Sequence, residues 1–404
     1  MRIGLRHNRQ TWINLASTFN ISVGRDKRIA IFTGAYNHVV DGVSLTLNRL
    51  VSYLECENTP VHIFAPTISQ PALKHAGTLT AVPSVSLPGR PEYKFSIGMS
   101  RRVITELDRF KPTIIHIATP DVLGLQALAY ARLRKIPVVA SYHTHFSSYL
   151  SFYHMDKLEG LAWAYLRWFY GKCEHVYVPS RSMAKVLSDH GIVKGVELWP
   201  RGVDIAMFHP DKRSMEWRRE KGFADDEIVV SFISRLVVEK GLQIYADVVD
   251  ALRKQGKKVR VLVAGTGPAE NLLRDRFPKA VFLGHLTGNE LATAYASSDI
   301  FLFPSATETF GNVTLEAMAS GTPALCANAT GSSSLVVHGE TGYLAEPGDV
   351  DSFIQYAMSL VDDAEKRKEM SLASRREAES YSWRLILGRI NGFYDKILVR
   401  EKAA

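Results

Sequence analysis

The amino-acid sequence predicts an α/β fold made of two doubly wound domains, each built on a parallel sheet. Three observations lead to this prediction. At 404 residues, the chain is longer than a single hydrophobic core usually serves. In both halves, short apolar runs of strand length alternate with segments of helical periodicity. Between the two sets, residues 199–210 contain two prolines and a glycine, which predicts a hinge.

The elements of the first half begin at residue 28. Residues 28–33 form an apolar run, and the helical periodicity of residues 43–54 completes a first strand–helix unit. Segments of the same two kinds then continue through this half, as a parallel sheet requires. The further expected strands are 61–65, 114–117, 138–141 and 176–178, with helices at 99–110 and 123–134.

The second half repeats this alternation without detectable sequence repetition. Its expected strands are 228–233, 259–264, 281–283, 300–303 and 323–326. Residues 362–379 are highly charged and predict an exposed helix, and residues 383–398 predict an amphipathic final helix.

The charge is distributed unevenly between the halves. Residues 1–200 contain 23 Lys/Arg and 13 Asp/Glu, a net charge of +10, whereas residues 201–404 contain 26 and 28, a net charge of −2. A basic domain suggests an anionic surface as its partner, such as phosphate-rich lipid headgroups or nucleic acid, although the charge also serves solubility. Residues 1–27 contain several arginines, and we expect a basic, poorly ordered extension there.

Three widely spaced cysteines imply neither a disulfide framework nor a zinc site and favour a reducing cytoplasm. No uninterrupted apolar run of about 18 residues occurs, so no membrane-spanning helix is predicted. We therefore expect a cytoplasmic protein that associates peripherally with the inner face of the membrane.

Two carboxylates separated by seven residues, Glu308 and Glu316, mark the most informative segment. An apolar strand precedes it and a short helix ended by Gly321 follows it, so the segment predicts a loop that runs directly into a helix. The free backbone N–H groups of such a helix start attract phosphate, and a nearby carboxylate can accept hydrogen bonds from sugar hydroxyls. Together these features indicate a nucleotide-sugar site.

With this segment, the chain resembles the retaining glycosyltransferases of family 4, whose GT-B fold consists of two Rossmann-like domains. The resemblance covers most of the chain. Residues 88–149 and 199–204 are most similar to the branch that contains sulfoquinovosyldiacylglycerol synthases and bacterial mannosyl- and glucuronosyltransferases. The implied domains are a basic extension, an acceptor-side domain, a nucleotide-sugar-binding domain and a final helix that packs on the first domain, at residues 1–27, 28–200, 201–380 and 381–404.

The resemblance assigns roles within the carboxylate segment. Glu308 is expected near the transferred sugar and its reacting carbon, and Glu316 at the ribose hydroxyls. The intervening donor-binding residues are Phe310, Gly311, Asn312 and Val313. A single glutamate before a helix usually only complements the helix dipole, but two at this spacing are more specific.

Two cations follow the predicted strand 228–233. Arg235 and Lys240 leave the carboxyl edge of a parallel strand, where open α/β sheets bind ligands. Held near the β-phosphate, they stabilise the charge that grows on the leaving nucleoside diphosphate. A solvated pair of loop cations is the alternative, and the family spacing favours the catalytic role.

A short glycine pattern, Gly265 and Gly267, follows the strand 259–264. It permits a tight turn, which is equally consistent with a ligand contact and with a purely structural turn. The resemblance places it beside the base or the ribose. In the first half, Gly42 stands where the family has a glycine loop close to the donor phosphate or the acceptor, although many members have paired glycines there.

Two histidines follow the strand 138–141. His143 matches the active-site histidine of the family and is expected to hydrogen-bond the donor sugar or hold the substrates in register. We interpret His145 as a structural or acceptor-site residue. Arg101 and Arg102 are candidates for contact with lipid headgroups, with a solvated helix face as the alternative.

No metal or other cofactor is predicted. Asp349 and Asp351 match an Asp-x-Asp pair formally, but their place before a helical segment predicts an N-cap instead. The expected reaction is metal-independent, retaining transfer of a hexosyl unit from a UDP- or GDP-sugar to a membrane lipid such as diacylglycerol. A saccharide acceptor and a non-catalytic sugar-nucleotide-binding protein are the alternatives. An anionic membrane surface is expected as a partner, and nucleic acid is not.

Overall fold

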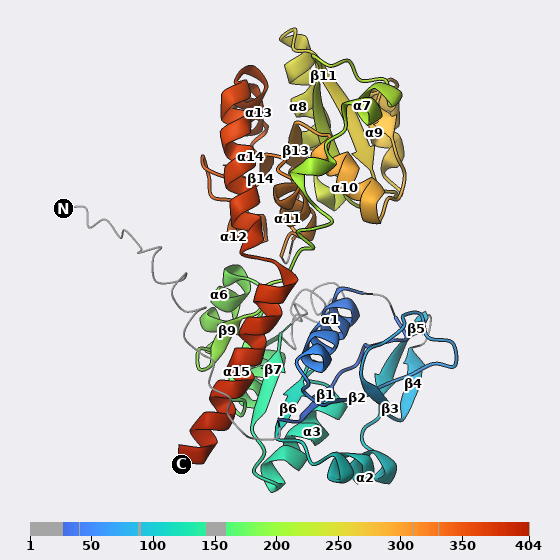
Figure 1. The fold of residues 1–404 in the computed structure, drawn as a ribbon, viewed down its shortest axis with the longest axis vertical. Coiled ribbons are helices and arrows are strands. Elements are labelled where there is room, and N and C mark those ends of the chain that lie inside the picture. The colour runs from blue at the N-terminus through green and yellow to red at the C-terminus, as the bar shows by residue number, and fades with distance from the viewer. Residues whose placement is uncertain are drawn as a thin grey trace, which may run out of the picture.

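A computed structural model of the chain describes residues 27–39, 41–87, 90–142, 159–308, 310–329 and 331–403. Two parallel sheets occupy the two halves, one above the other, and the final helix runs down beside the lower one (Figure 1). The predicted α/β class with two Rossmann-like domains is confirmed.

The first sheet has the strand order β3-β2-β1-β6-β7-β8-β9, and its paired strands are all parallel. Its central strands are fully buried because both faces are covered. The strands are β1 (Ile29–Phe32), β2 (Val61–Ala65), β3 (Thr78–Ala81), β6 (Ile114–Ile117), β7 (Val138–Ser141), β8 (His175–Val178) and β9 (Val196–Leu198).

Four helices of this half, α1, α2, α3 and α6, begin at capping residues that the sequence provides. At α1, Asp41 accepts hydrogen bonds from the backbone N–H groups of Val43 and Ser44, and the Asp41 backbone N–H donates to the Ser44 hydroxyl oxygen, which completes a capping box. The described helices are α1 (Gly42–Cys56), α2 (Arg101–Phe110), α3 (Val122–Leu133), α5 (Glu159–Tyr170) and α6 (Arg181–Asp189).

The second sheet has the order β12-β11-β10-β13-β14-β15 and is also parallel. Its strands are β10 (Ile228–Ile233), β11 (Val259–Ala264), β12 (Val281–Phe282), β13 (Ile300–Phe303), β14 (Ala324–Ala327) and β15 (Gly342–Ala345). The 3-10 helices are η3 (Pro210–Lys212) and η4 (Val238–Lys240). The α-helices are α7 (Met215–Glu220), α8 (Leu242–Lys254), α9 (Glu270–Arg276), α10 (Gly288–Ala296), α11 (Asn312–Ala319), α12 (Ser332–Leu335), α13 (Val350–Asp362) and α14 (Ala364–Glu379).

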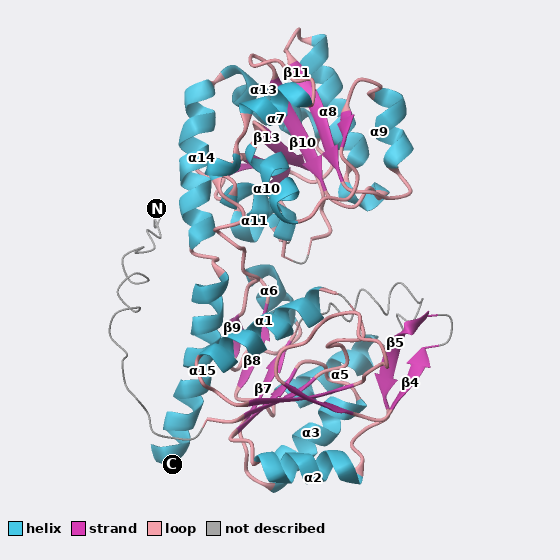
Figure 2. Cartoon of the chain, turned by 45° about the vertical axis from the view of Figure 1, so that its right-hand side comes forward, coloured by secondary structure: helices cyan, strands magenta, loops and turns pink. Residues whose placement is uncertain are grey.

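The last helix, α15 (Trp383–Ala403), returns to the first half of the chain. It follows directly after α14 and lies along the first sheet in both overall views (Figures 1 and 2). Its apolar side packs in one cluster with α1 and the first sheet. The Tyr394 hydroxyl lies 2.7 Å from Nδ1 of His116, a β6 residue whose pKa burial lowers to about 3. This neutral histidine is therefore part of the domain core.

Five strands were absent from the sequence-based description: β3, β9, β15 and the two strands of an antiparallel hairpin. The hairpin consists of β4 (Ser84–Leu87) and β5 (Arg90–Ser96) and forms a separate sheet. β3 and β9 are half-exposed edge strands, so they lack the continuous apolar run that identified the central strands. The aromatic segment at α5 is mainly packed in the core, with Trp163, Phe169 and Tyr170 buried and Trp168 47% exposed.

Candidate active site

Three loops meet at the carboxyl edge of the second sheet. The loop after β10 runs beside the loop after β11, because Leu236 donates its backbone N–H to Thr266 and Ala269 donates to Leu236. Gly265 has a φ of +125°, and a Cβ at Gly265 or Gly267 would overlap backbone atoms of the neighbouring loop. These glycines are thus required by close backbone packing, independently of any ligand contact.

Lys240 and Glu308 form an ion pair that joins the loops after β10 and β13. The Lys240 ammonium donates to Oε1 of Glu308, and their side chains are only 10% and 17% exposed. Gly241 lies against the same loop, since a Cβ there would be 2.8 Å from the carbonyl oxygen of Pro304. The two residues predicted to act on the leaving group and the sugar are therefore brought into direct contact.

Arg235 lies in the same loop as Lys240 but has a different environment. Its side chain is exposed and makes no hydrogen bond or ion pair with another described residue. Its guanidinium donors are available at the edge of the sheet, and its predicted phosphate contact stays a prediction. The structure does not join Arg235 directly to the Lys240–Glu308 pair.

The segment between the two glutamates is a loop followed by α11, as predicted. Gly311 is the N-cap of this helix with a φ of +93°, in the left-handed region that favours glycine. No side chain caps this end, so the first backbone N–H groups of α11 are available to an anion. Phe310 is buried and anchors the loop, whereas Asn312 is exposed and Val313 half-buried at the helix start.

Gly331 packs directly against this loop and supports it. Its backbone N–H donates to the carbonyl oxygen of Glu308 at 2.8 Å, and a Cβ on it would overlap the backbone of Phe310. Thr314 also lies 3.2 Å from the Ser332 hydroxyl. The sequence alone did not predict this role of Gly331. Its supporting role could not be read from the sequence because it depends on two loops that are distant along the chain.

Glu316 lies on α11 and, like Glu308, is partly buried. The Tyr295 hydroxyl donates to its Oε2 at 3.2 Å. Burial raises the pKa of Glu316 to about 7, against the opposing effects of the Tyr295 hydrogen bond and the Arg49 cation. The two carboxylates therefore have different surroundings: one is paired with lysine, and the other changes charge near neutral pH.

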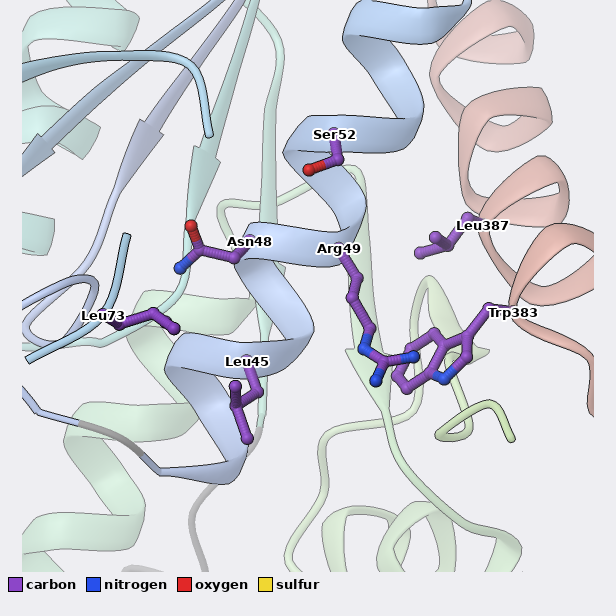
Figure 3. Close-up of a pocket in the computed structure, with 7 residues that line it drawn as sticks. All are labelled: Leu45, Asn48, Arg49, Ser52, Leu73, Trp383 and Leu387. Atoms are coloured by element: carbon purple, nitrogen blue, oxygen red, sulfur yellow. The ribbon is translucent and has the colours of Figure 1, made fainter. Parts of the chain in front are cut away.

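Arg49 comes from α1 of the first half and links the two halves electrostatically. Its guanidinium lies over the Trp383 ring, 4.5 Å from the ring centroid (Figure 3). Both residues border a groove of about 310 Å³ between α1 and α15. The groove is lined by Leu45, Asn48, Arg49, Ser52, Leu73, Trp383 and Leu387.

Gly42 is the first residue of α1, at the carboxyl edge of the first sheet. The Arg201 guanidinium donates to the Gly42 carbonyl oxygen and to the Thr46 hydroxyl. A Cβ at Gly42 would lie 2.8 Å from a guanidinium nitrogen of Arg201. Sequence reasoning assigned Arg201 only to the hinge and missed this contact, which the spacing of 159 residues does not reveal.

Two of the predicted residues, His143 and His145, lie outside the described residues. Arg101 and Arg102 are the first residues of α2, and both are exposed. Asp349 is the N-cap of α13, where it accepts a hydrogen bond from the Ser352 N–H at 3.2 Å, as expected.

Within the described part of the chain, no group of three His, Cys, Asp or Glu side chains could hold a metal ion. The three cysteines are free. None of the described helices is both long enough and apolar enough to cross a membrane.

The fold and the arrangement of its loops define a two-domain glycosyltransferase of the GT-B class. The chain belongs to glycosyltransferase family 4: the family model "Glycosyltransferase Family 4" matches residues 40–207, and "Glycosyl transferases group 1" matches residues 214–377. Its reaction class is therefore hexosyl transfer.

Similar proteins include sulfoquinovosyl transferase SQD2 of Arabidopsis thaliana, which is 34% identical. The aligned region covers 91% of this chain and 73% of that protein. A GDP-mannose-dependent alpha-mannosyltransferase of Mycolicibacterium smegmatis is 32% identical, and the aligned region covers 93% of this chain and 98% of that protein. An alpha-monoglucosyldiacylglycerol synthase of Streptococcus pneumoniae is 28% identical, with 74% and 70% covered.

Solved structures share the fold at lower identity. Sucrose-phosphate synthase from Thermosynechococcus elongatus superposes with a TM-score of 0.71 at 17% identity, covering 93% of this chain and all of that one. Anabaena Alr3699/HepE in complex with UDP gives 0.70 at 18% identity, covering 92% and 100%.

Proposed function

We propose that this protein transfers a hexosyl unit from a UDP- or GDP-sugar to a membrane lipid such as diacylglycerol, with retention at the anomeric carbon and without a metal ion. The observation that carries the proposal is the contact between Lys240 and Glu308 beside the open start of α11. This arrangement puts a cation, a carboxylate and anion-binding backbone N–H groups at one edge of the sheet.

The donor diphosphate would bind at the start of α11, between its backbone N–H groups and the two cations. Arg235 and Lys240 would then stabilise the negative charge that accumulates on the phosphate as the glycosidic bond breaks. This electrostatic role is the one that a divalent cation fills in metal-dependent enzymes. In this proposal the two cations make a metal ion unnecessary.

The two glutamates would hold different parts of the donor. Glu308, oriented by Lys240, would accept hydrogen bonds from hydroxyls of the transferred sugar close to the reacting carbon. Glu316, one to two turns into α11, would accept hydrogen bonds from the ribose. Tyr295 already donates to one Glu316 oxygen, which orients the carboxylate.

Retention would follow from attack on the face that the diphosphate leaves. A short-lived ion pair forms as the bond to the phosphate oxygen breaks, and the acceptor oxygen then bonds to the anomeric carbon while its proton passes to the leaving phosphate. His143 would hold the substrates in register. The products are the glycosylated acceptor and a nucleoside diphosphate.

The lipid acceptor is favoured by the similar alpha-monoglucosyldiacylglycerol synthase, whose name describes a glycolipid product. A second acceptor class is favoured by the mannosyltransferases, which are comparably similar. Their names describe GDP-mannose as the donor, and in this second candidate function this chain would transfer the hexosyl unit from a GDP-sugar to a saccharide precursor.

The test is an assay of purified protein with labelled UDP- and GDP-sugars and diacylglycerol dispersed in detergent, with and without a chelator. We expect labelled lipid and released nucleotide in both conditions, with anomeric retention in the product. Glu308→Ala is expected to abolish the labelling, whereas Glu290→Ala, an exposed change on α10, is expected to preserve it. Labelling of saccharides alone would exclude the lipid acceptor, and loss of activity with chelator would exclude the metal-free mechanism.

A further inference from the structure

The β4–β5 hairpin carries an apolar face that the described residues do not cover. Val85 lies directly opposite Phe95 in the antiparallel pair, so their side chains share one face. Ile97 is two residues further along and donates its N–H to Pro83, which continues the ladder and places it on the same face. Val85, Phe95 and Ile97 are 52%, 56% and 60% exposed, and we refer to these three residues as the hairpin face.

The opposite face of the hairpin has polar residues where apolar ones are expected. Ser84 lies opposite Ser96, and Ser96 is buried, with 6% of its surface exposed. An antiparallel hairpin on a domain in water normally turns its apolar side chains inward and its polar ones outward. Around Ser96 this pattern is inverted, because Ser96 is buried while its neighbours Phe95 and Ile97 are exposed; Ser86, on the same face as Ser96, is exposed as well. The exposed apolar side chains point to an apolar partner for the outer face.

Free cations lie close to the hairpin face along the chain. Residues 84–105 contain four Arg or Lys and one Glu. Arg101 and Arg102 begin α2 only four residues after Ile97, and both are exposed. Neither guanidinium forms a hydrogen bond or ion pair within the described part of the chain. Apolar side chains flanked by unpaired cations are typical of surfaces that bind anionic lipids.

The position of the hairpin leaves it accessible. It lies beyond the edge strand β3, on the side of the first sheet away from α15 in both overall views (Figures 1 and 2). It also belongs to the half of the chain that carries the net charge of +10.

The size of the hairpin face argues against a second copy of this chain as its partner. Three side chains of these kinds expose roughly 300 Å² at most, compared with about 800 Å² per partner in a stable protein interface. A bilayer needs no matching surface, because each apolar group contributes favourably wherever it enters the acyl region.

We propose that the hairpin face inserts into a bilayer containing anionic lipids while Arg101 and Arg102 contact its headgroups. This would bring the first domain to the surface from which a lipid acceptor is taken, so the inference rests on the proposed lipid acceptor. It adds a defined docking element that is separate from the donor loops.

The test is sedimentation of the purified full-length protein with vesicles, either of phosphatidylcholine alone or with one third phosphatidylglycerol. The variant V85S/F95S/I97S removes the hairpin face, and R101Q/R102Q removes the cations. A matched control, V193S/L372S, removes two other exposed apolar side chains that are 66% and 60% exposed. Thermal unfolding of each variant would verify that the fold is retained.

We expect the wild type and the control to bind the anionic vesicles. The triple variant should bind at least about tenfold more weakly, and the double arginine variant severalfold more weakly, with a smaller dependence on salt. All variants should retain transfer to diacylglycerol dispersed in detergent, where no docking step is needed. Unchanged vesicle binding by the triple variant would overturn the inference. If the wild type were a dimer and the triple variant a monomer with the same vesicle binding, the hairpin face would be a protein interface instead, which would also overturn it.

The two proposals fail in different ways. Vesicle binding that depends on the hairpin, without transfer to any lipid, would refute the proposed acceptor and leave the docking element in place. Transfer to dispersed lipid without vesicle binding by the wild type would refute the docking element alone.

Discussion

The two halves of the molecule hold the backbone at their ligand-facing edges by different means. In the second half, backbone packs directly on backbone: a Cβ at Gly331 would overlap the main chain of Phe310. In the first half, a Cβ at Gly42 would instead meet a guanidinium nitrogen of Arg201 at 2.8 Å. The guanidinium is the end of a long side chain that can move, whereas a main-chain atom can move only with its loop.

This difference predicts a more rigid site in the second half and a more adjustable one in the first. Loops that lie directly on one another have few alternative arrangements, so the second half would present a preformed site to the donor. An edge that is held by a side chain can adjust, which would suit the first half as the proposed acceptor side. The following predictions test this contrast, from the largest expected effect to the smallest.

Replacing Lys240 by methionine should have the largest effect, because it removes both the cation for the leaving phosphate and the partner of Glu308. We expect kcat to fall by about 10²- to 10³-fold, the range found when one charge-stabilising group is removed from an active site. Steady-state kinetics would measure the change, with the exposed Lys258→Met as the matched control.

The Lys240 variant also leaves Glu308 partly buried without its partner, which costs stability. The double variant Lys240→Met/Glu308→Gln should recover the thermal midpoint but not the activity. Recovery of activity in the double variant would show that the loss was structural.

Gly331→Ala and Gly42→Ala test the contrast directly, because each adds one methyl group to one half. Gly331→Ala should weaken donor binding about ten- to a hundredfold, since the loop from Glu308 to Gly311 must shift. Gly42→Ala should change it by less than about threefold because Arg201 can move aside. Calorimetric titration with the nucleoside diphosphate would measure both, with Gly392→Ala, which has open space around it, as the control. Equal effects of the two substitutions would refute the contrast.

The raised pKa of Glu316 predicts a dependence on pH. An acid whose pKa is higher in the folded than in the unfolded chain stays protonated after the unfolded chain has ionised. The wild type should therefore lose stability relative to Glu316→Gln as the pH rises from about 4.5 to about 7, with a constant difference above that. Denaturant titrations of both proteins across this range would measure the difference.

Donor affinity should rise with increasing pH, whereas the stability of the fold falls. Ionised Glu316 accepts hydrogen bonds from hydroxyls better than the protonated acid does. The affinity of the wild type should rise more steeply than that of Glu316→Gln as the pH passes about 7. If the donor affinity of the two proteins depended on pH in the same way, the proposed hydrogen bonds between Glu316 and the ribose would be contradicted.

Arg49→Gln should have the smallest effect. Arg49 stands on α1 of the first half, and its cation lowers the pKa of Glu316 in the second. Without it, the pKa of Glu316 should be higher, so the pH midpoint of donor binding should move upward while kcat at high pH stays nearly unchanged. Arg384→Gln on α15 serves as a matched control. An unchanged midpoint would show that the two halves are not coupled through this pair.

Much of the second half could be predicted from the sequence because its signals are local. The buried strands are continuous apolar runs, and Gly311 and Asp349 mark the helix starts that the structure contains. The spacing of Glu308 and Glu316 is also a local feature. By contrast, the sequence gives no sign that Lys240 contacts Glu308, because 68 residues separate them.

The hairpin was missed for a related reason. Its apolar residues alternate with serines and with Lys94, which is the period of a strand, but no contiguous apolar run marks it. Which face of such a strand meets water depends on where the hairpin lies relative to the first sheet. Only the structure shows that Ser96 is buried while its neighbour Phe95 is exposed.

The sequence by itself determined the α/β class, the two sets of strand–helix units and the carboxylate segment, because strand runs, helix caps and glycine turns depend on residues that are close together in the chain. Tertiary structure alone decided which loops touch, that Gly331 supports the loop before α11, that Arg201 holds the start of α1, and that Glu316 is buried enough to change charge near pH 7. Burial, pairing and pKa are set by neighbours in space, and those neighbours come from distant parts of the chain.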